Sequence, residues 1–386
     1  MSRPLLAAGL LALLCAWAAG TGCSSSSAST SLSSRLVAPG GASPLLGLLD
    51  ARTMLDHVPS RHGTLAGRDG VPIFWRAIDP GDYRFRYRYD AAPGSDGTHG
   101  RRFDLGFDGN ATGTSVAPTP RGTVILLHGW MMDGDSLLPW SLTLAQAGYR
   151  SIALDLRNHG QSGTGLSGYG TRESDDVVKV IGELRQRGEI RGPLYLFGVS
   201  YGAATALFSA DKLGDRVAGV VAMESFANAG RGIRQMVPHL LAETPHGWQA
   251  RAVSGYMRWR YGNQDIDQVI AAADHQLGIN LDRLDVAPAL ADTRACVLLL
   301  HGDADRHIPV AHGRALAAAA PRAHYLELHG EDHLTLPMRI DVLAPIVEGW
   351  FASNRQARAQ CPQPLPLPVD NGQRVQLTQP AAASRG

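Results

Sequence analysis

The chain has 386 residues, of which 44% are hydrophobic and 18% are charged, and its formal net charge is +1. This length and apolar content suffice for one large α/β domain or two smaller ones. The near-zero net charge gives no indication of nucleic-acid binding or of an acidic tail.

The first 22 residues have the pattern of a signal peptide. Arg3 is followed by an apolar run over residues 4–20, which is short for a membrane span. The segment Gly20-Thr21-Gly22-Cys23, followed by four serines, resembles a bacterial lipoprotein signal in which Cys23 is lipidated, although that pattern usually carries Leu where Gly20 stands. Ala16-Trp17-Ala18 offers the alternative cleavage site of an ordinary secreted protein. We expect an exported chain, in the periplasm or attached to the outer membrane only through a lipid anchor.

The segments between the signal peptide and residue 122 predict a linker, a short helix, two strands and a long loop. Residues 23–43 are rich in Ser and Gly and predict a disordered linker, and residues 45–58 predict a short helix. Residues 71–78 predict a strand. Residues 83–89 alternate aromatic and arginine side chains, which indicates an outer strand with one buried face, the alternative being a basic binding surface. Residues 91–121 predict a long loop because they are rich in Gly, Ser, Thr and Pro.

From residue 122 onward, predicted strands alternate with predicted helices. The strands are expected at 124–127, 151–154, 194–197, 217–223, 297–300 and 324–328, and the helices at 137–147, 173–187, 203–213, 310–320 and 340–353. This alternation predicts a mostly parallel sheet with helices on both faces, in one domain over residues 45–354. Residues 226–292 interrupt it and predict a small helical cap. Residues 355–386 are rich in Pro and Gln and predict an unstructured tail.

Ser200 lies at the centre of the pattern Gly198-Val199-Ser200-Tyr201-Gly202, between a predicted strand and a predicted helix. The two glycines suit a tight turn at which neighbouring backbone comes close. A serine hydroxyl needs a general base, and the base needs an acid to orient it. Asp305 and His333 follow the next two strands of the sheet in that order, and Asp303 is an alternative acid.

The order Ser, Asp, His behind such a turn resembles the α/β-hydrolase superfamily. Further shared motifs are His128-Gly129-Trp130, the segment from Asp155 to Ser162, the acidic loop over residues 302–309 and Gly330 to His333. The resemblance implies Ser200 as nucleophile, His333 as general base, Asp305 as the orienting acid, and the backbone N–H groups of Trp130 and Tyr201 as the oxyanion hole. The other histidines near these motifs are expected to be structural; they are His128, His159, His301 and His329.

The leading functional hypothesis is a serine hydrolase that cleaves a small carboxylic ester through an acyl-enzyme. A serine aminopeptidase or amidase resembling the prolyl aminopeptidases is the first alternative, with Glu243, Asp265 or Asp267 of the cap as candidates to hold a substrate amine. A non-catalytic exported binding protein is the second. Met257 and Trp259 of the cap are predicted to line the substrate site. We expect no cofactor and no metal, because no Cys or His cluster has ligand spacing; the oligomeric state is open.

Cys296 and Cys361 are predicted to form a disulfide. Cys296 begins the strand that leads to Asp305, so it lies at the amino end of the sheet. The closing helix runs back from the active-site end and brings Cys361 to that same end. An oxidising compartment would then permit the bond, whereas a buried Cys296 and a free Cys361 are the alternative.

Overall fold

The computed structural model describes residues 31–40, 51–56, 58–93, 99–107, 119–243, 248–320, 322–355 and 360–367. The predicted signal peptide and Cys23 lie outside these ranges, and most of the predicted linker does too. Within the described residues, no helix combines the length and the apolar character that a membrane crossing requires.

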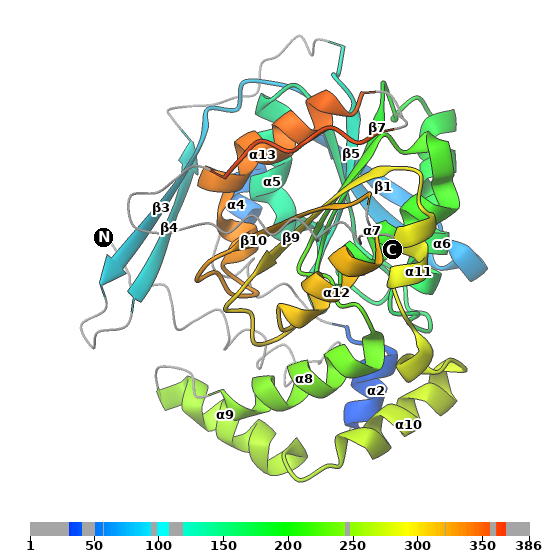
Figure 1. The fold of residues 1–386 in the computed structure, drawn as a ribbon, viewed down its shortest axis with the longest axis vertical. Helices are drawn as coiled ribbons and strands as arrows, with labels where there is room; N and C mark the ends of the chain where they lie inside the picture. Colours follow the sequence, from blue (N-terminus) through cyan, green and yellow to red (C-terminus); the bar gives the residue numbers. More distant parts are fainter. Residues whose placement is uncertain are drawn as a thin grey trace, which may run out of the picture.

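A large, mostly parallel sheet forms the centre of the described part of the chain (Figure 1). Its strands, in spatial order, are β1 (Ser60–Ala66), β2 (Pro72–Ile78), β6 (Arg150–Leu154), β5 (Thr123–Leu127), β7 (Leu194–Val199), β8 (Gly219–Met223), β9 (Cys296–Gly302) and β10 (His324–Leu328). The pairs β1–β2 and β2–β6 are antiparallel, and the other neighbours are parallel. The central strands are short apolar runs buried on both faces, which is typical of parallel sheets. Strand β1 was not predicted, because its largely polar sequence lies exposed at the sheet edge.

Helices cover both faces of the sheet, so the α/β-hydrolase architecture expected from the sequence is confirmed. One face packs against α5 (Leu138–Gln146) and α13 (Ile340–Ser353), and the other against α6 (Thr171–Gln186), α7 (Tyr201–Leu213), α11 (Ala287–Asp292) and α12 (Ala311–Ala319). The connecting segments contain a further short helix, α4 (Ala51–Asp56), and the 3₁₀ turns η1 (Arg68–Gly70), η2 (Gly134–Leu137), η3 (Gly214–Arg216), η4 (Leu281–Arg283) and η5 (Leu336–Met338).

Three helices between β8 and β9 form a separate layer beside the carboxyl ends of the strands (Figure 1). They are α8 (Ala229–Ala242), α9 (Trp248–Tyr261) and α10 (Ile266–Leu277), and we call them the cap. A fourth helix, α2 (Leu32–Val37), packs against α10, which corrects the prediction of disorder over this part of residues 23–43. Leu32 and Leu36 are one helical turn apart and only 1% and 0% exposed. Their burial orders a segment for which the high serine content had predicted a linker.

The segment predicted as a loop over residues 91–121 contains a strand. Strands β3 (Phe85–Pro93) and β4 (His99–Phe107) pair antiparallel as a hairpin, separate from the main sheet at the left of Figure 1. Phe103, Leu105 and Phe107 alternate with smaller or polar residues, and this alternation is typical of a strand. The high glycine content of the segment led instead to the prediction of a loop. In β3 the side chain of Phe85 is buried and those of the arginines are exposed, as in an outer strand with one buried face.

The start of the predicted tail is ordered. Cys361 forms a disulfide with Cys296, and their Cα atoms lie 5.4 Å apart. Leu367 is buried against the α13 side of the core. The covalent bond and this apolar contact hold residues 360–367 on the domain, so the prediction of an unstructured tail is wrong for this part of it.

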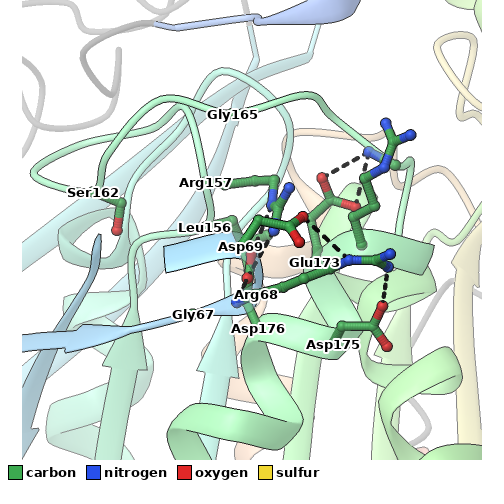
Figure 2. A network of polar contacts seen from close by, with 12 residues as sticks. Gly67, Arg68, Asp69, Leu156, Arg157, Ser162, Gly165, Glu173, Asp175 and Asp176 are labelled. Carbon is green, nitrogen blue, oxygen red and sulfur yellow. Dashed lines mark hydrogen bonds and ion pairs between the residues drawn. The ribbon is translucent and has the colours of Figure 1, made fainter. Parts of the chain in front are cut away.

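A buried ion pair anchors the loop that follows β6 (Figure 2). Arg157 donates through Nε and Nη2 to the two carboxylate oxygens of Asp176 on α6, at 2.7 and 2.8 Å, and both side chains are almost completely buried. The Arg157 Nη1 atom donates to the Leu166 carbonyl at 3.0 Å, and the Arg68 N–H donates to Asp176 at 2.6 Å. Because each charged group makes several hydrogen bonds, the pair fixes the loop that also carries His159. Loss of one partner would cost about 3–5 kcal/mol.

Candidate active site

Ser200 occupies the tight turn between β7 and α7 in a strained backbone conformation, with φ at 53° and ψ at −114°. Its N–H donates to the Met223 carbonyl of the neighbouring strand at 2.8 Å. A Cβ atom on Gly198 would lie 2.2 Å from the Gly202 carbonyl oxygen, and one on Gly202 would lie 2.1 Å from the Leu127 carbonyl oxygen. The close approach of backbone therefore requires both glycines, and the turn holds the serine side chain above the sheet.

Ser200, His333 and Asp305 form a hydrogen-bonded row. The His333 Nε2 atom lies 2.9 Å from the Ser200 Oγ atom, and the His333 Nδ1 atom lies 2.7 Å from Oδ2 of Asp305. When Nδ1 donates to the carboxylate, Nε2 is left as an acceptor for the serine proton. The three residues come from the loops that follow β7, β10 and β9, whose carboxyl ends meet at one edge of the sheet.

The carboxylate of Asp305 is held in its ionised form. Its Oδ1 atom accepts the backbone N–H groups of His307 and Ile308, both at 2.8 Å. Burial opposes ionisation, but the His333 charge and hydrogen bonds from His301 and His333 outweigh it, so the pKa of Asp305 lies below its usual range. A fixed negative charge beside Nδ1 can orient the imidazole and stabilise its protonated form.

The alternative acid, Asp303, faces a surface turn. Its Oδ2 atom bonds with Nδ1 of the exposed His329 at 2.6 Å, and its Oδ1 atom accepts the Gly330 N–H at 2.6 Å. These contacts shape the turn after β10, which leaves Asp305 as the carboxylate hydrogen-bonded to His333.

His128 and His159 support the loop that carries Trp130. The His159 Nε2 atom accepts the Met131 N–H at 3.1 Å, and the His128 Nε2 atom accepts the Leu156 N–H at 3.0 Å. Burial lowers the pKa of His159 to about 4 and that of His128 well below its usual value. Both rings are therefore neutral near pH 7, and they fix the loop by accepting backbone N–H groups.

The backbone N–H groups of Trp130 and Tyr201 were predicted to supply the oxyanion hole; Trp130 lines the same pocket as Ser200, and Tyr201 follows Ser200 directly in the chain. Tyr201 is the first residue of α7, where an N–H group has no partner within its own helix. Neither of these two N–H groups donates to another protein atom in the part of the chain that the structure describes. Two such free donors beside a serine hydroxyl can hold a developing oxyanion.

A largely apolar pocket opens above Ser200 and His333. The apolar side chains of its wall come from the loop after β5, from η2 and α5, from the end of β7, from the cap helix α8 and from the segment after β10. They are Trp130, Met132, Leu137, Pro139, Trp140, Val199, Met236, Leu240, Leu334, Pro337 and Met338. The polar side chains of the wall are Ser136, Ser200, His307 and His333. Among the described residues, no carboxylate, lysine or arginine lines this pocket.

Comparison with known proteins identifies the family. A model of the alpha/beta hydrolase family matches residues 124–345, which is more than half of the chain. The chain belongs to this family. It is a hydrolase by family, and the match covers the strands and loops that bring Ser200, Asp305 and His333 together.

Individual relatives are more distant. This α/β-hydrolase is 38% identical over 100 residues to the uncharacterized protein YqkD of Bacillus subtilis, across 25% of this chain and 32% of that protein, so it spans about a third of that relative's length. It is 26% identical over 233 residues to a 2-(acetamidomethylene)succinate hydrolase of Mesorhizobium japonicum, across 54% of this chain and 81% of that protein.

Solved structures share the fold at low identity. The Pyrococcus furiosus esterase Pf2001 is 15% identical with a TM-score of 0.53, across 80% of this chain and 95% of that one. A 2,6-dihydroxy-pseudo-oxynicotine hydrolase is 14% identical with a TM-score of 0.51, across 83% of this chain and 74% of that one. At this identity the likeness concerns the architecture of the hydrolase.

The cap residues predicted to contact substrate do not line the pocket. Met257 is 2% exposed and packs in the core shared by the cap and the α6–α7 side of the sheet, whereas Trp259 is 75% exposed on the outside of α9. The cap reaches the pocket through Met236 and Leu240 of α8 instead. The prediction was wrong about the helix because α8 lies between α9 and the site, an arrangement that composition cannot reveal.

Glu224 is a neighbour of His333 that the sequence analysis did not single out. It follows β8 directly, is 0% exposed, and places its Oε2 atom 3.6 Å from Nδ1 of His333. Neither carboxyl oxygen has a hydrogen-bond partner within the described residues. Burial, reinforced by the charges of Asp305 and Asp332, raises the pKa of Glu224 well above its usual value. Its position after a strand, like that of Asp305, was the signal available in the sequence.

The protonated state of Glu224 predicts a pH-dependent effect on stability. Its carboxyl ionises in the unfolded chain near pH 4.5 but stays protonated in the folded protein above that pH. The wild type should therefore lose stability as the pH rises above 4.5, by on the order of 1 kcal/mol per pH unit from this group. The Glu224→Gln variant has no carboxyl to ionise and lacks this loss. In urea unfolding, its free energy of unfolding should therefore exceed that of wild type by an amount that grows from pH 5 to pH 8. An equal difference at both pH values would contradict the assignment.

Proposed function

We propose that this α/β-hydrolase cleaves small carboxylic esters with an apolar acyl group, through an acyl-enzyme on Ser200. The observation that carries the proposal is the hydrogen-bonded row from Ser200 through His333 to Asp305 on the floor of an apolar pocket. A strained serine, an aligned base and a charged acid are the parts that nucleophilic acyl transfer requires.

The reaction follows from these positions. His333 takes the Ser200 proton on Nε2 as Oγ bonds to the ester carbonyl carbon, and the N–H groups of Trp130 and Tyr201 hold the resulting oxyanion. Each of these donors contributes about 3 kcal/mol to the transition state. The oxyanion collapses, the ester C–O bond breaks, and His333 gives its proton to the leaving alcohol. A water molecule then attacks the acyl-enzyme with His333 again as base, which releases the acid and restores the serine.

The pocket favours a neutral acyl group over an amino-acyl group. No described lining residue is a carboxylate that could hold a substrate amine. Of the three candidates for that role, Asp265 accepts the N–H of Asp267 at the start of α10, and Asp267 pairs with Arg234. Glu243 lies beside His239 at the end of α8, outside the pocket lining.

The proposal is tested with p-nitrophenyl esters of increasing acyl length beside amino-acyl anilides. We expect hydrolysis of the esters with kcat/KM rising over the short and medium chains, and much weaker hydrolysis of the anilides. Preference for the anilides would favour the aminopeptidase alternative. Saturable binding without turnover would favour the non-catalytic binding protein.

Asp305 and Asp303 provide a matched pair that locates the acid. Asp305→Asn should lower kcat by about 10⁴-fold, because an amide at this position favours the wrong tautomer of His333. Asp303→Asn should change kcat by less than about tenfold, because the hydrogen bonds of that side chain go to His329 and Gly330 of the surface turn. Steady-state kinetics of the two variants decide between them. Glu224 would be the acid if Asp305→Asn lowered kcat only mildly and the double variant with Glu224→Gln lowered it severely.

Met236 and Met257 provide a matched pair for the pocket wall. Met236→Ala enlarges a pocket to which this side chain contributes, so the preferred acyl chain should become longer. Met257→Ala creates a cavity in the core, so it should lower the free energy of unfolding by about 2–5 kcal/mol and leave chain-length preference unchanged. A preference shift in Met257→Ala alone would contradict this assignment of the wall.

A further inference from the structure

Three side chains with metal-binding atoms meet where the cap touches the loop after β9. His239 and Glu243 are one helical turn apart at the end of α8, and the His239 Nε2 atom lies 3.1 Å from Oε1 of Glu243. His307 belongs to the loop that carries Asp305. One ligand atom of each residue can be chosen so that all three lie within 4.8 Å of one another.

The ring nitrogens of His307 are buried and unpaired within the part of the chain that the structure describes. The residue is 7% exposed, and neither Nδ1 nor Nε2 has a hydrogen-bond partner within the described residues. Its ring lies against that of His239, with the centroids 4.8 Å apart and the planes at 89°. The Oε2 atom of Glu243 is likewise buried without a partner. Buried polar atoms normally have partners, so these orphaned atoms point to a missing ligand.

We propose that His239, Glu243 and His307 bind a zinc ion. Two imidazoles and one carboxylate are a donor set that zinc uses, and three protein ligands leave one position for water. In tetrahedral zinc sites the ligand atoms lie about 3.4 Å apart, as bond lengths of 2.0–2.1 Å imply. The His239–Glu243 pair, at 3.1 Å, is already near that separation, and the His307 ligand atom lies within 4.8 Å of both.

Hydrogen bonds hold the backbone on both sides of the proposed site. The Ser254 hydroxyl on α9 donates to the Glu243 carbonyl at 2.8 Å, which fixes the chain at the end of α8. The His307 N–H donates to Asp305, which fixes the opposite side. The ligands thus come from two elements that are each held in place before the ion binds.

A bound ion would join the cap to the catalytic loop. His307 lines the pocket, and its ring stacks on that of His333 with the centroids 5.4 Å apart. Helix α8 also supplies Met236 and Leu240 to the pocket wall. Zinc would therefore tie the cap helix α8 to the loop that carries Asp305 and hold His307 against His333.

The test is titration of the chelator-treated full chain, free of any histidine tag, with Zn²⁺ by isothermal titration calorimetry. We expect one high-affinity Zn²⁺ per chain and a Tm that rises with Zn²⁺ concentration. Glu243→Gln and His239→Ala should each raise the Kd at least tenfold and abolish the Tm shift. This binding assay is independent of the proposed ester hydrolysis.

A matched control separates this site from surface histidines. His329 also pairs with a carboxylate, that of Asp303, but it lies on the exposed turn after β10. His329→Ala should therefore keep the wild-type Kd. Glu243→Gln keeps the shape of the side chain, so it carries the test if His239→Ala does not fold. An unchanged Kd in Glu243→Gln, or no saturable binding to wild type, would overturn the proposal.

Discussion

Replacing Ser200 with alanine is expected to lower kcat for a p-nitrophenyl ester by about 10⁶-fold. Removal of the nucleophile from a working triad has an effect of this size, because the covalent route is lost and only the oxyanion hole and binding remain. The fold should persist, since the serine is held through its backbone N–H and, among the described residues, its hydroxyl is hydrogen-bonded to His333 alone. Stopped assays at high enzyme concentration measure the residual rate.

A fluorophosphonate probe gives the second readout. Wild type should be labelled covalently and Ser200→Ala should not. Ser136 is a matched control because it lines the same pocket, yet its hydroxyl is occupied by a hydrogen bond to the Asp133 carbonyl at 2.6 Å. Ser136→Ala should be labelled like wild type. Equal labelling of wild type and Ser200→Ala would remove Ser200 from the role of nucleophile.

Replacing His333 with alanine is expected to lower kcat by about 10⁴–10⁶-fold. The serine then lacks a base within hydrogen-bond distance, and the leaving alcohol lacks a proton donor. Substrate binding should change little, so the loss should fall on kcat rather than on KM. Added imidazole should restore part of the rate, because the deleted ring leaves a space beside Ser200. Steady-state kinetics with and without imidazole measure both effects.

His329→Ala is the matched control for the base. It removes an exposed histidine four residues earlier in the same loop and should leave kcat unchanged. A His333→Ala variant with nearly full activity would transfer the role of base to His307, the other histidine in the pocket wall. Loss of activity in His329→Ala would instead point to disruption of the whole loop.

The sequence by itself determined the fold class and the order in which the candidate site residues follow the strands. Short apolar strands alternating with amphipathic helices fix a parallel sheet, because only that arrangement buries strands on both faces. Parallel strands end at the same edge, so residues that follow them in the chain gather there. Ser200, Asp305 and His333 could therefore be chosen from the sequence. The tight turn at Gly198 and Gly202 could be predicted because its requirement is local.

Tertiary structure alone decided which cap helix lines the pocket and which groups from distant parts of the chain lie close together. Helices α8 and α9 both carry methionine and aromatic or aliphatic residues, and only their packing sets Met236 in the pocket wall and Met257 in the core. The meeting of His239 and Glu243 with His307, more than 60 residues later in the chain, has no signature in spacing. The packing of helix α2 against α10 likewise has no signature in the local sequence. Its two leucines are buried because α10 provides an apolar surface next to them. Contacts between distant segments depend on how each element is rotated and placed, and local patterns in the chain do not encode that.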